Sequence, residues 1–203
     1  MTEIEHFFTP VSGYAYLGHD ALLRLAGEYG AHVRQRPVDI ARVFVEGGST
    51  PPAKQSDARR AYRATDIARW AEARGLPVNA KPRFWPTDGA PAARVIIAAD
   101  RMNGPVDRLA RATLAACWAR DLDIAAEDTL SMLVRECGLD PRLVLQVAAE
   151  PETQTIFEAN TQAAIDAGVF GSPTYLVEGE IFFGQDRLDS LVWRLDQKNL
   201  RKK

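Results

Sequence analysis

The sequence has few cysteines. Its 203 residues include only Cys117 and Cys137, which form no CxxC pair. Both fall in segments expected to be helical, where buried, small hydrophobic side chains are the expected role. An enzyme that exchanges disulfides through its own cysteines is therefore disfavoured, and a structural disulfide is not expected in a reducing compartment. A zinc site is not expected either, because His6, His19 and His32 have no spacing that gathers them.

A long apolar run and an excess of positive charge are also missing. The most apolar window, residues 93–99, is too short to span a bilayer. The opening MTEIEHFF is acidic and lacks the apolar core of a secretory signal. The net charge is −2, so no basic field indicates nucleic acid. We therefore expect a cytoplasmic protein that binds neither membranes nor nucleic acid.

Both ends of the sequence predict alternating strands and helices. The opening is expected to form a strand at 3–8, a helix at 14–29 and a second strand at 31–40. The closing part is expected to form strands at 174–179 and 180–185 and a helix at 186–195. A strand, a helix and a strand in succession indicate a parallel pair with a right-handed crossover.

The middle of the chain is predicted to be nearly all helix after a Gly/Pro/Ser loop at 45–55. The expected helices cover 57–74, 92–102, 106–118, 129–137, 141–149 and 152–167. Without this block, the order β-α-β and β-β-α is that of a thioredoxin fold. The sequence therefore predicts an α/β thioredoxin fold with a large all-helical insertion. Its discontinuous thioredoxin-like domain would comprise 1–44 and 168–203, and the insertion 45–167.

Ser12 stands where the first strand leads into the first helix. A thioredoxin fold holds its reactive group in this loop, and a helix N-terminus stabilises an anion. Ser12 cannot form a disulfide, but its hydroxyl can donate a hydrogen bond to a thiolate that another molecule brings. The alternative is an ordinary N-cap, which contributes about 1 kcal/mol. Spacing alone favours the N-cap.

Two stretches near the C-terminus could complete a site with Ser12. Pro173 directly precedes a strand, which permits a cis bond to Ser172; a trans proline at the strand entry is the alternative. A cis bond would expose the backbone of Ser172 to an extended, peptide-like ligand. Gln185 and Asp186 begin the last predicted helix. Asp186 could be a plain N-cap or could bind an ammonium group.

Several short motifs, in order along the chain, together resemble one family. They are SGYAYLG at 12–18, GSTPP at 48–52, the set Arg59, Tyr62, Asp66 and Arg69, GVFGSPT at 168–174 and GQDR at 184–187. The chain resembles 2-hydroxychromene-2-carboxylate isomerases and the similar kappa-class glutathione transferases, a DsbA-like branch of the thioredoxin superfamily. The matches span nearly the whole chain, and the last two motifs are the most specific.

The resemblance implies glutathione as cofactor, a small aromatic substrate and a homodimer. It implies that Ser12 contacts the glutathione sulfur. The other residues it implies for binding glutathione are Ser49, Arg59, Ser172, Pro173, Gln185 and Asp186. An aromatic substrate needs an apolar wall, for which Tyr14, Phe84 and Trp85 are candidates. Each of these three could equally serve in the core.

The chain departs from the family pattern at three positions. Gly13 replaces the proline that follows the serine, which loosens the loop. Ser49 replaces an asparagine and so lacks an amide that could reach the ligand. Thr9 stands where many members carry aspartate. These departures bear on the substrate more than on the fold.

The function expected from the resemblance is glutathione-dependent cis/trans isomerisation of an aromatic-catabolism intermediate. Reversible thiol addition, bond rotation and elimination would carry it. The first alternative is a kappa-like transferase that conjugates small electrophiles at the same site. The second is a non-catalytic thioredoxin-fold binding module.

Overall fold

A four-stranded mixed sheet forms the centre of the protein. The computed structural model describes residues 2–200. The sheet contains β1 (Thr2–Phe8), β2 (Ala31–Pro37), β3 (Thr174–Val177) and β4 (Glu180–Phe183), in the order β2-β1-β3-β4. β1 pairs with β2 in parallel through the crossover helix α1 (Gly13–Glu28), and the other pairs are antiparallel. The predicted thioredoxin fold is confirmed.

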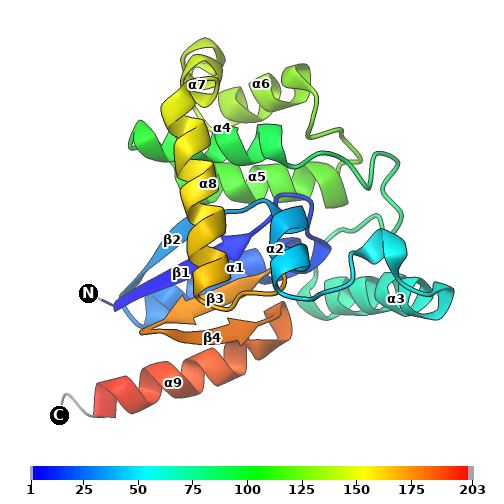
Figure 1. The fold of residues 1–203 in the computed structure, drawn as a ribbon, viewed down its shortest axis with the longest axis vertical. Coiled ribbons are helices and arrows are strands. Elements are labelled where there is room, and N and C mark those ends of the chain that lie inside the picture. The colour runs from blue at the N-terminus through cyan, green and yellow to red at the C-terminus, as the bar shows by residue number, and fades with distance from the viewer. Residues whose placement is uncertain (1, 201–203) are drawn as a thin grey trace.

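Helices cover both faces of the sheet because the side chains of β1 alternate between them (Figure 1). Ile4 is buried in one cluster with Leu22 of α1 and Leu191 of α9 (Leu188–Leu200). Phe7 points to the other face, where it packs with Val43 of α2 (Ile40–Glu46) and Ala164 of α8 (Pro151–Asp166). The sheet therefore lies between two helical layers.

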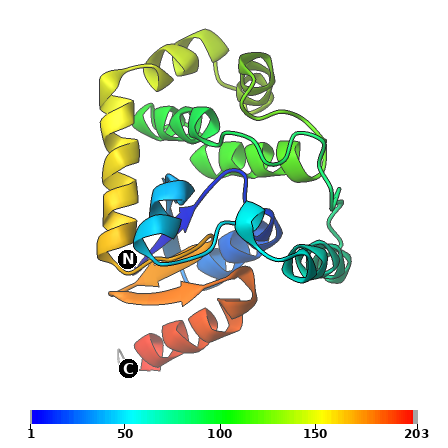
Figure 2. The same ribbon diagram turned by 45° about the vertical axis from the view of Figure 1, so that its right-hand side comes forward.

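The helical insertion stands at one end of the sheet. Its further helices are α3 (Asp57–Arg74), α4 (Ala90–Arg101), α5 (Val106–Trp118), α6 (Glu127–Glu136) and α7 (Pro141–Ala148). Local sequence sets their ends. The Ser56 hydroxyl accepts from the Arg59 amide at the start of α3, and Gly75, at φ 63°, ends it in the left-handed conformation. α8 runs from the helical block down to the sheet (Figure 2).

The insertion shares its core with the sheet domain. Leu17 of α1 belongs to the same buried cluster as Ile96 of α4, Leu114 of α5 and Val144 of α7. Burial of each such side chain contributes about 1.5–3 kcal/mol. The predicted division at 44 and 168 thus passes through continuous packing, and it stays a prediction.

Two local predictions were wrong. The second strand ends at Pro37, and α2 follows, because the Asp39 side chain accepts from the Ala41 and Arg42 amides and starts a helix. The last helix does not begin at residue 186. Gln185–Arg187 form a 3₁₀ turn after Gly184, whose φ is 101°, and α9 begins at Leu188.

No helix within residues 2–200 has the length and apolarity that crossing a bilayer requires. The same residues contain no cluster of three or more His, Cys, Asp or Glu side chains that could bind a metal ion.

Candidate functional site

Ser12 caps α1 and connects it to the opposite end of the chain. Its hydroxyl accepts a hydrogen bond from the Ala15 amide at 3.1 Å. The same hydroxyl donates to the Ser172 carbonyl at 3.1 Å. Ser12 is 7% exposed, so its hydroxyl lies just beneath the surface. The N-cap predicted as one of its two roles is confirmed.

A second hydrogen bond between the same loops fixes this arrangement. The Thr9 amide donates to the Ser172 hydroxyl at 3.0 Å, and the Ser12 amide donates to the Thr9 carbonyl at 3.0 Å. The Ser172-Pro173 bond is cis, one of the two conformations that the sequence left open. The structure thus brings the predicted stretches around Ser12 and Pro173 together.

The first turn of α1 also presents backbone donors. The Gly13 and Tyr14 amides lie in the first turn of α1, where no carbonyl of the helix is placed to accept from them. Within residues 2–200, neither amide has a hydrogen-bond partner. The N-terminus of a 16-residue helix carries roughly half a positive charge. These donors beside the Ser12 hydroxyl make a place for an anion.

Gly13, a departure from the family pattern, has a packing reason. A Cβ atom there would lie 3.0 Å from Ile67 Cδ1 of α3 and 3.0 Å from Trp118 Cζ2 of α5. A side chain would therefore push these helices away from the start of α1. The glycine lets both helices approach the residue that follows Ser12.

A pocket of about 280 Å³ is lined by Ile67 and Trp118, the two residues that approach Gly13, but not by Ser12 itself. The side chains that line it include Pro52, Arg63, Ile67, Pro82, Trp85 and Trp118. The indole N–H groups of Trp85 and Trp118 both donate to the Val11 carbonyl, at 3.2 and 3.3 Å. The aromatic wall is thus attached to the residue before Ser12.

The three predicted substrate-pocket residues have different places. Trp85 lines the pocket. Tyr14 does not line the pocket; its ring lies under the Arg63 guanidinium, and its hydroxyl donates to Asp66 at 3.0 Å. Phe84 does not line the pocket. Its ring instead packs under the Arg83 guanidinium, whose central carbon lies 4.5 Å from the ring centroid.

Among the residues that the structure describes, neither of the predicted residues of the middle segment forms a hydrogen bond with Ser12. The Ser49 hydroxyl donates to the Phe170 carbonyl at 2.7 Å, so Ser49 is bonded to the residue two positions before Ser172. Arg59 is exposed on α3, and its guanidinium forms no hydrogen bond or ion pair in the described part of the chain. Arg59 is therefore a solvated charge in this structure.

Gln185 and Asp186 point in opposite directions. Gln185 is only 2% exposed, and its backbone carbonyl accepts from Arg74 at 3.2 Å. Its Cβ lies against Gly18, where an added Cβ would be 2.8 Å away. Asp186 is on the surface, 3.4 Å from Arg187. Asp186 can reach a ligand, whereas the Gln185 side chain supports the turn from inside.

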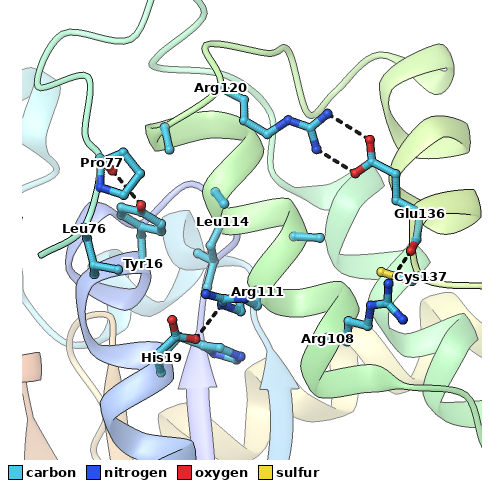
Figure 3. A pocket seen from close by; sticks show the side chains of 14 residues that line it. Tyr16, His19, Leu76, Pro77, Arg108, Arg111, Leu114, Arg120, Glu136 and Cys137 are labelled. Carbon is cyan, nitrogen blue, oxygen red and sulfur yellow. Dashed lines mark hydrogen bonds and ion pairs between the residues drawn. The ribbon is translucent and has the colours of Figure 1, made fainter.

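A second pocket, of about 360 Å³, lies between α1, α5 and α6 (Figure 3). Each of its arginines already has a partner, which for Arg108 is the Glu136 backbone carbonyl at 2.6 Å. Arg120 contacts Glu136 through two hydrogen bonds, of 2.7 and 2.9 Å, and Figure 3 shows the two groups facing each other. Arg111 pairs with Asp20 at 2.7 Å. With these partners satisfied, this pocket offers less to a charged ligand than the first.

Neither cysteine supplies a reactive group to these pockets, although Cys137 lines the second one. Cys117 and Cys137 are free and buried, as expected. Burial raises the pKa of Cys117 to about 12, and it also raises the pKa of Cys137. Neither thiol is ionised at neutral pH, so neither is a nucleophile in this fold.

Sequence reasoning missed Arg63 and Trp118 as pocket residues. Arg63 stands four positions before Ile67, on the face of α3 that the buried Ile67 marks. That spacing was the available signal. Trp118 was assigned to a buried helix face, which is correct, since it is 1% exposed. Its edge nevertheless forms part of the pocket wall.

Comparison with known proteins gives concordant matches over almost the full length. The model of the DSBA-like thioredoxin domain matches residues 3–196. The chain is 26% identical to a 2-hydroxychromene-2-carboxylate isomerase of Sphingobium xenophagum over 189 residues, 93% of this chain and 95% of the relative. It is 23% identical to glutathione S-transferase kappa 1 of Homo sapiens, with 96% and 91% covered. A solved structure of a 2-hydroxychromene-2-carboxylate isomerase superposes with a TM-score of 0.80 at 22% identity, covering 99% of each chain.

Proposed function

The chain belongs to the DSBA-like thioredoxin domain family, and from that premise we propose that it is a glutathione-dependent cis/trans isomerase. Its substrate would be a small aromatic compound that resembles 2-hydroxychromene-2-carboxylate. One observation carries the proposal. A serine, Ser12, occupies the N-terminus of α1 beside unpaired amides and an aromatic pocket. Relatives of both named classes support it.

The residues present fit glutathione at its sulfur. A thiolate is an anion, and the Gly13 and Tyr14 amides have no other acceptor within residues 2–200. Ser172 adds backbone groups for an extended peptide, while Ser49, Arg59 and Asp186 would hold its polar ends. When bound, glutathione supplies a thiolate that adds reversibly to a conjugated double bond and so allows that bond to rotate.

Ser12 would act by hydrogen bonding to the sulfur. Its proton now goes to the Ser172 carbonyl at 3.1 Å. To turn toward an anion, the hydroxyl must give up that neutral hydrogen bond, which contributes about 1 kcal/mol. A charge-assisted bond is roughly twice as strong, so the exchange is favourable. The rotation also frees a lone pair of the Ser172 carbonyl for a peptide N–H.

The rest of the chain would orient the substrate and limit water. Trp85 presents ring surface and Trp118 an edge to the pocket, whose volume of 280 Å³ is near the lower end of small-molecule sites, which begin at about 300 Å³. A flat aromatic ring would lie against this wall. Val11 links the wall to the Ser12 loop, so the substrate would lie next to the sulfur.

A kappa-like transferase is the second candidate, favoured by the match to the human kappa enzyme. It would use the same donors at Ser12 and the same pocket. The two functions differ in the fate of glutathione, because an isomerase regenerates it and a transferase consumes it.

The test supplies 2-hydroxychromene-2-carboxylate with a trace of glutathione and follows isomer absorbance and free thiol together. Isomerisation over many turnovers with constant thiol is expected. Loss of one thiol per product would establish the transferase instead. If a calorimetric titration shows no binding of glutathione, the remaining interpretation is a non-catalytic thioredoxin-fold binding module.

The proposal includes a homodimer in the cytoplasm. Val45 is 76% exposed. The rings of Phe170 and Phe183 pack in a tilted arrangement, 4.6 Å between centroids, and Phe170 also lies against Gly47. These side chains offer apolar surface to a second copy. Light scattering on the purified protein would distinguish a dimer from a monomer.

A further inference from the structure

Arg63 carries a half-buried charge with no acidic partner. Its guanidinium lies over the rings of Tyr14, Trp85 and Trp118, at 5.7, 4.6 and 5.5 Å from their centroids. Within residues 2–200 it forms no hydrogen bond and no ion pair. Burial lowers the pKa of this guanidinium from its ordinary value, so the charge has lost part of its hydration.

The neighbouring arginines of α3 all differ from Arg63. Arg60 contacts Asp57 and the Gln55 carbonyl. Arg69 pairs with Asp66 at 3.4 Å. Arg59 is exposed and therefore hydrated. Arg63 alone among these four combines a missing partner with partial burial.

Asp66 could have neutralised Arg63, but it is used elsewhere. Its carboxylate accepts from the Tyr14 hydroxyl at 3.0 Å. It also pairs with Arg69 on the outer face of α3. The aromatic rings attract the faces of the guanidinium, whereas its N–H donors lie at the edge of its plane. Those edge donors still lack an acceptor, and Arg63 borders the pocket.

We propose that Arg63 is the specificity-determining residue of this pocket and binds the carboxylate of a flat, conjugated co-substrate. The carbon skeleton of that compound lies against Trp85 and Trp118. This inference rests on the proposed function for the position of the reacting double bond, which must lie toward Ser12. Arginine suits the role because its fork matches both carboxylate oxygens.

Glutathione also has carboxylates, so the carboxylate that Arg63 binds could belong either to the conjugated compound or to glutathione. The lining favours the co-substrate, because Pro52, Ile67, Pro82 and the two tryptophans present mostly apolar surface. A polar tripeptide would gain little from these contacts. The two sources are separated by titrating each ligand alone.

The first measurement uses the unmodified protein without glutathione. Calorimetry compares trans-cinnamate with trans-cinnamamide, which has the same shape but no charge. Cinnamate is expected to bind at least roughly tenfold more tightly, as a charge-assisted hydrogen bond in a partly dry site predicts. Equal affinities would overturn the proposal.

The second measurement uses matched variants. Arg63→Gln should lower cinnamate affinity by roughly 10- to 100-fold and leave cinnamamide affinity unchanged. Arg60→Gln changes an arginine of the same pocket whose guanidinium is already engaged, and it should leave both affinities within about threefold. Arg63→Lys keeps the charge without the fork and should fall between. An equal loss in the Arg60 and Arg63 variants would overturn the assignment.

The glutathione titration keeps this test separate from the proposed function. Arg63→Gln should bind glutathione as the unmodified protein does. A loss of glutathione affinity with unchanged cinnamate binding would assign Arg63 to the cofactor and overturn the inference. If glutathione binds neither protein while cinnamate still depends on Arg63, the inference stands and the proposed function fails.

Discussion

The Ser12 hydroxyl donates to the Ser172 carbonyl at 3.1 Å, although the two residues lie near opposite ends of the chain. A thioredoxin fold makes this contact possible because β1 lies next to β3, so the loop after the first strand meets the loop before the third. Any ligand anion at α1 therefore meets both serines.

Removal of the Ser12 hydroxyl should change the acidity of a bound thiol. In Ser12→Ala, we expect the apparent thiol pKa of bound glutathione to rise by roughly 1 unit, because the hydrogen bond to the charged form is lost. Thiolate absorbance against pH measures this shift. The variant should also lose about 1 kcal/mol of stability as an N-cap.

Ser56→Ala is the matched control for that variant. Ser56 caps α3 as Ser12 caps α1, accepting from the Arg59 amide. It should show a similar loss of stability and no change in the thiol titration. An identical titration in the two variants would remove Ser12 from the proposed site.

Substitution of Gly13 should be destabilising although alanine favours helices. In Gly13→Ala, the new methyl group meets Ile67 and Trp118 at 3.0 Å, and we expect a loss of about 1–2 kcal/mol by overpacking. Gly27→Ala, also in α1, meets nothing within 4 Å and should gain about 0.5–1 kcal/mol. Urea unfolding compares the two. Equal effects would show that helix propensity and not packing governs Gly13.

The protein should lose stability in mild acid. Burial lowers the pKa of His6 to about 3, with a smaller contribution from His19. An unfolded histidine has a pKa of about 6.5, so the unfolded chain binds more protons between these values. The stabilisation is complete above about pH 6.5 and is lost as the pH falls toward 3, by up to about 1.4 kcal/mol per pH unit.

Urea unfolding at several pH values measures this slope. His6→Phe keeps an aromatic ring in the stack with Phe8 and Tyr175 and removes the titrating group. This variant should show a shallower dependence of the unfolding free energy on pH. The same slope with and without His6 would assign the acid sensitivity to other groups.

The cysteines should be unreactive in the folded protein. Cys117 is 1% exposed, and burial raises its pKa to about 12. We expect no reaction of either thiol with a disulfide reagent under native conditions, and complete reaction in urea. Rapid native labelling would contradict the burial of these side chains.

Sequence reasoning succeeded where local chemistry decides the structure. Ser12 was predicted as an N-cap, and the helix predicted from residue 141 begins there because the Asp140 side chain caps it. It failed for α2, because alternating residues continue through residue 40 while the Asp39 side chain starts a helix. A periodicity of two cannot reveal a capping bond.

The site residues that escaped prediction depend on packing between distant helices. Arg63 became notable only when α3, α5 and the loop at Trp85 were placed together. Conversely, Gln185 follows the family motif in sequence, yet the 3₁₀ turn buries its side chain. Whether a motif residue faces a ligand is decided by backbone geometry, which the motif does not specify.

One carbonyl oxygen, that of Val11, accepts from the indole groups of both Trp85 and Trp118. A change that tilts either indole therefore also shifts the backbone that leads into Ser12. Ala64 and Ala80 also line the pocket but do not bond to the Val11 carbonyl. Substitutions at these two positions would therefore change the shape of the pocket while the turn at Ser12 keeps its geometry.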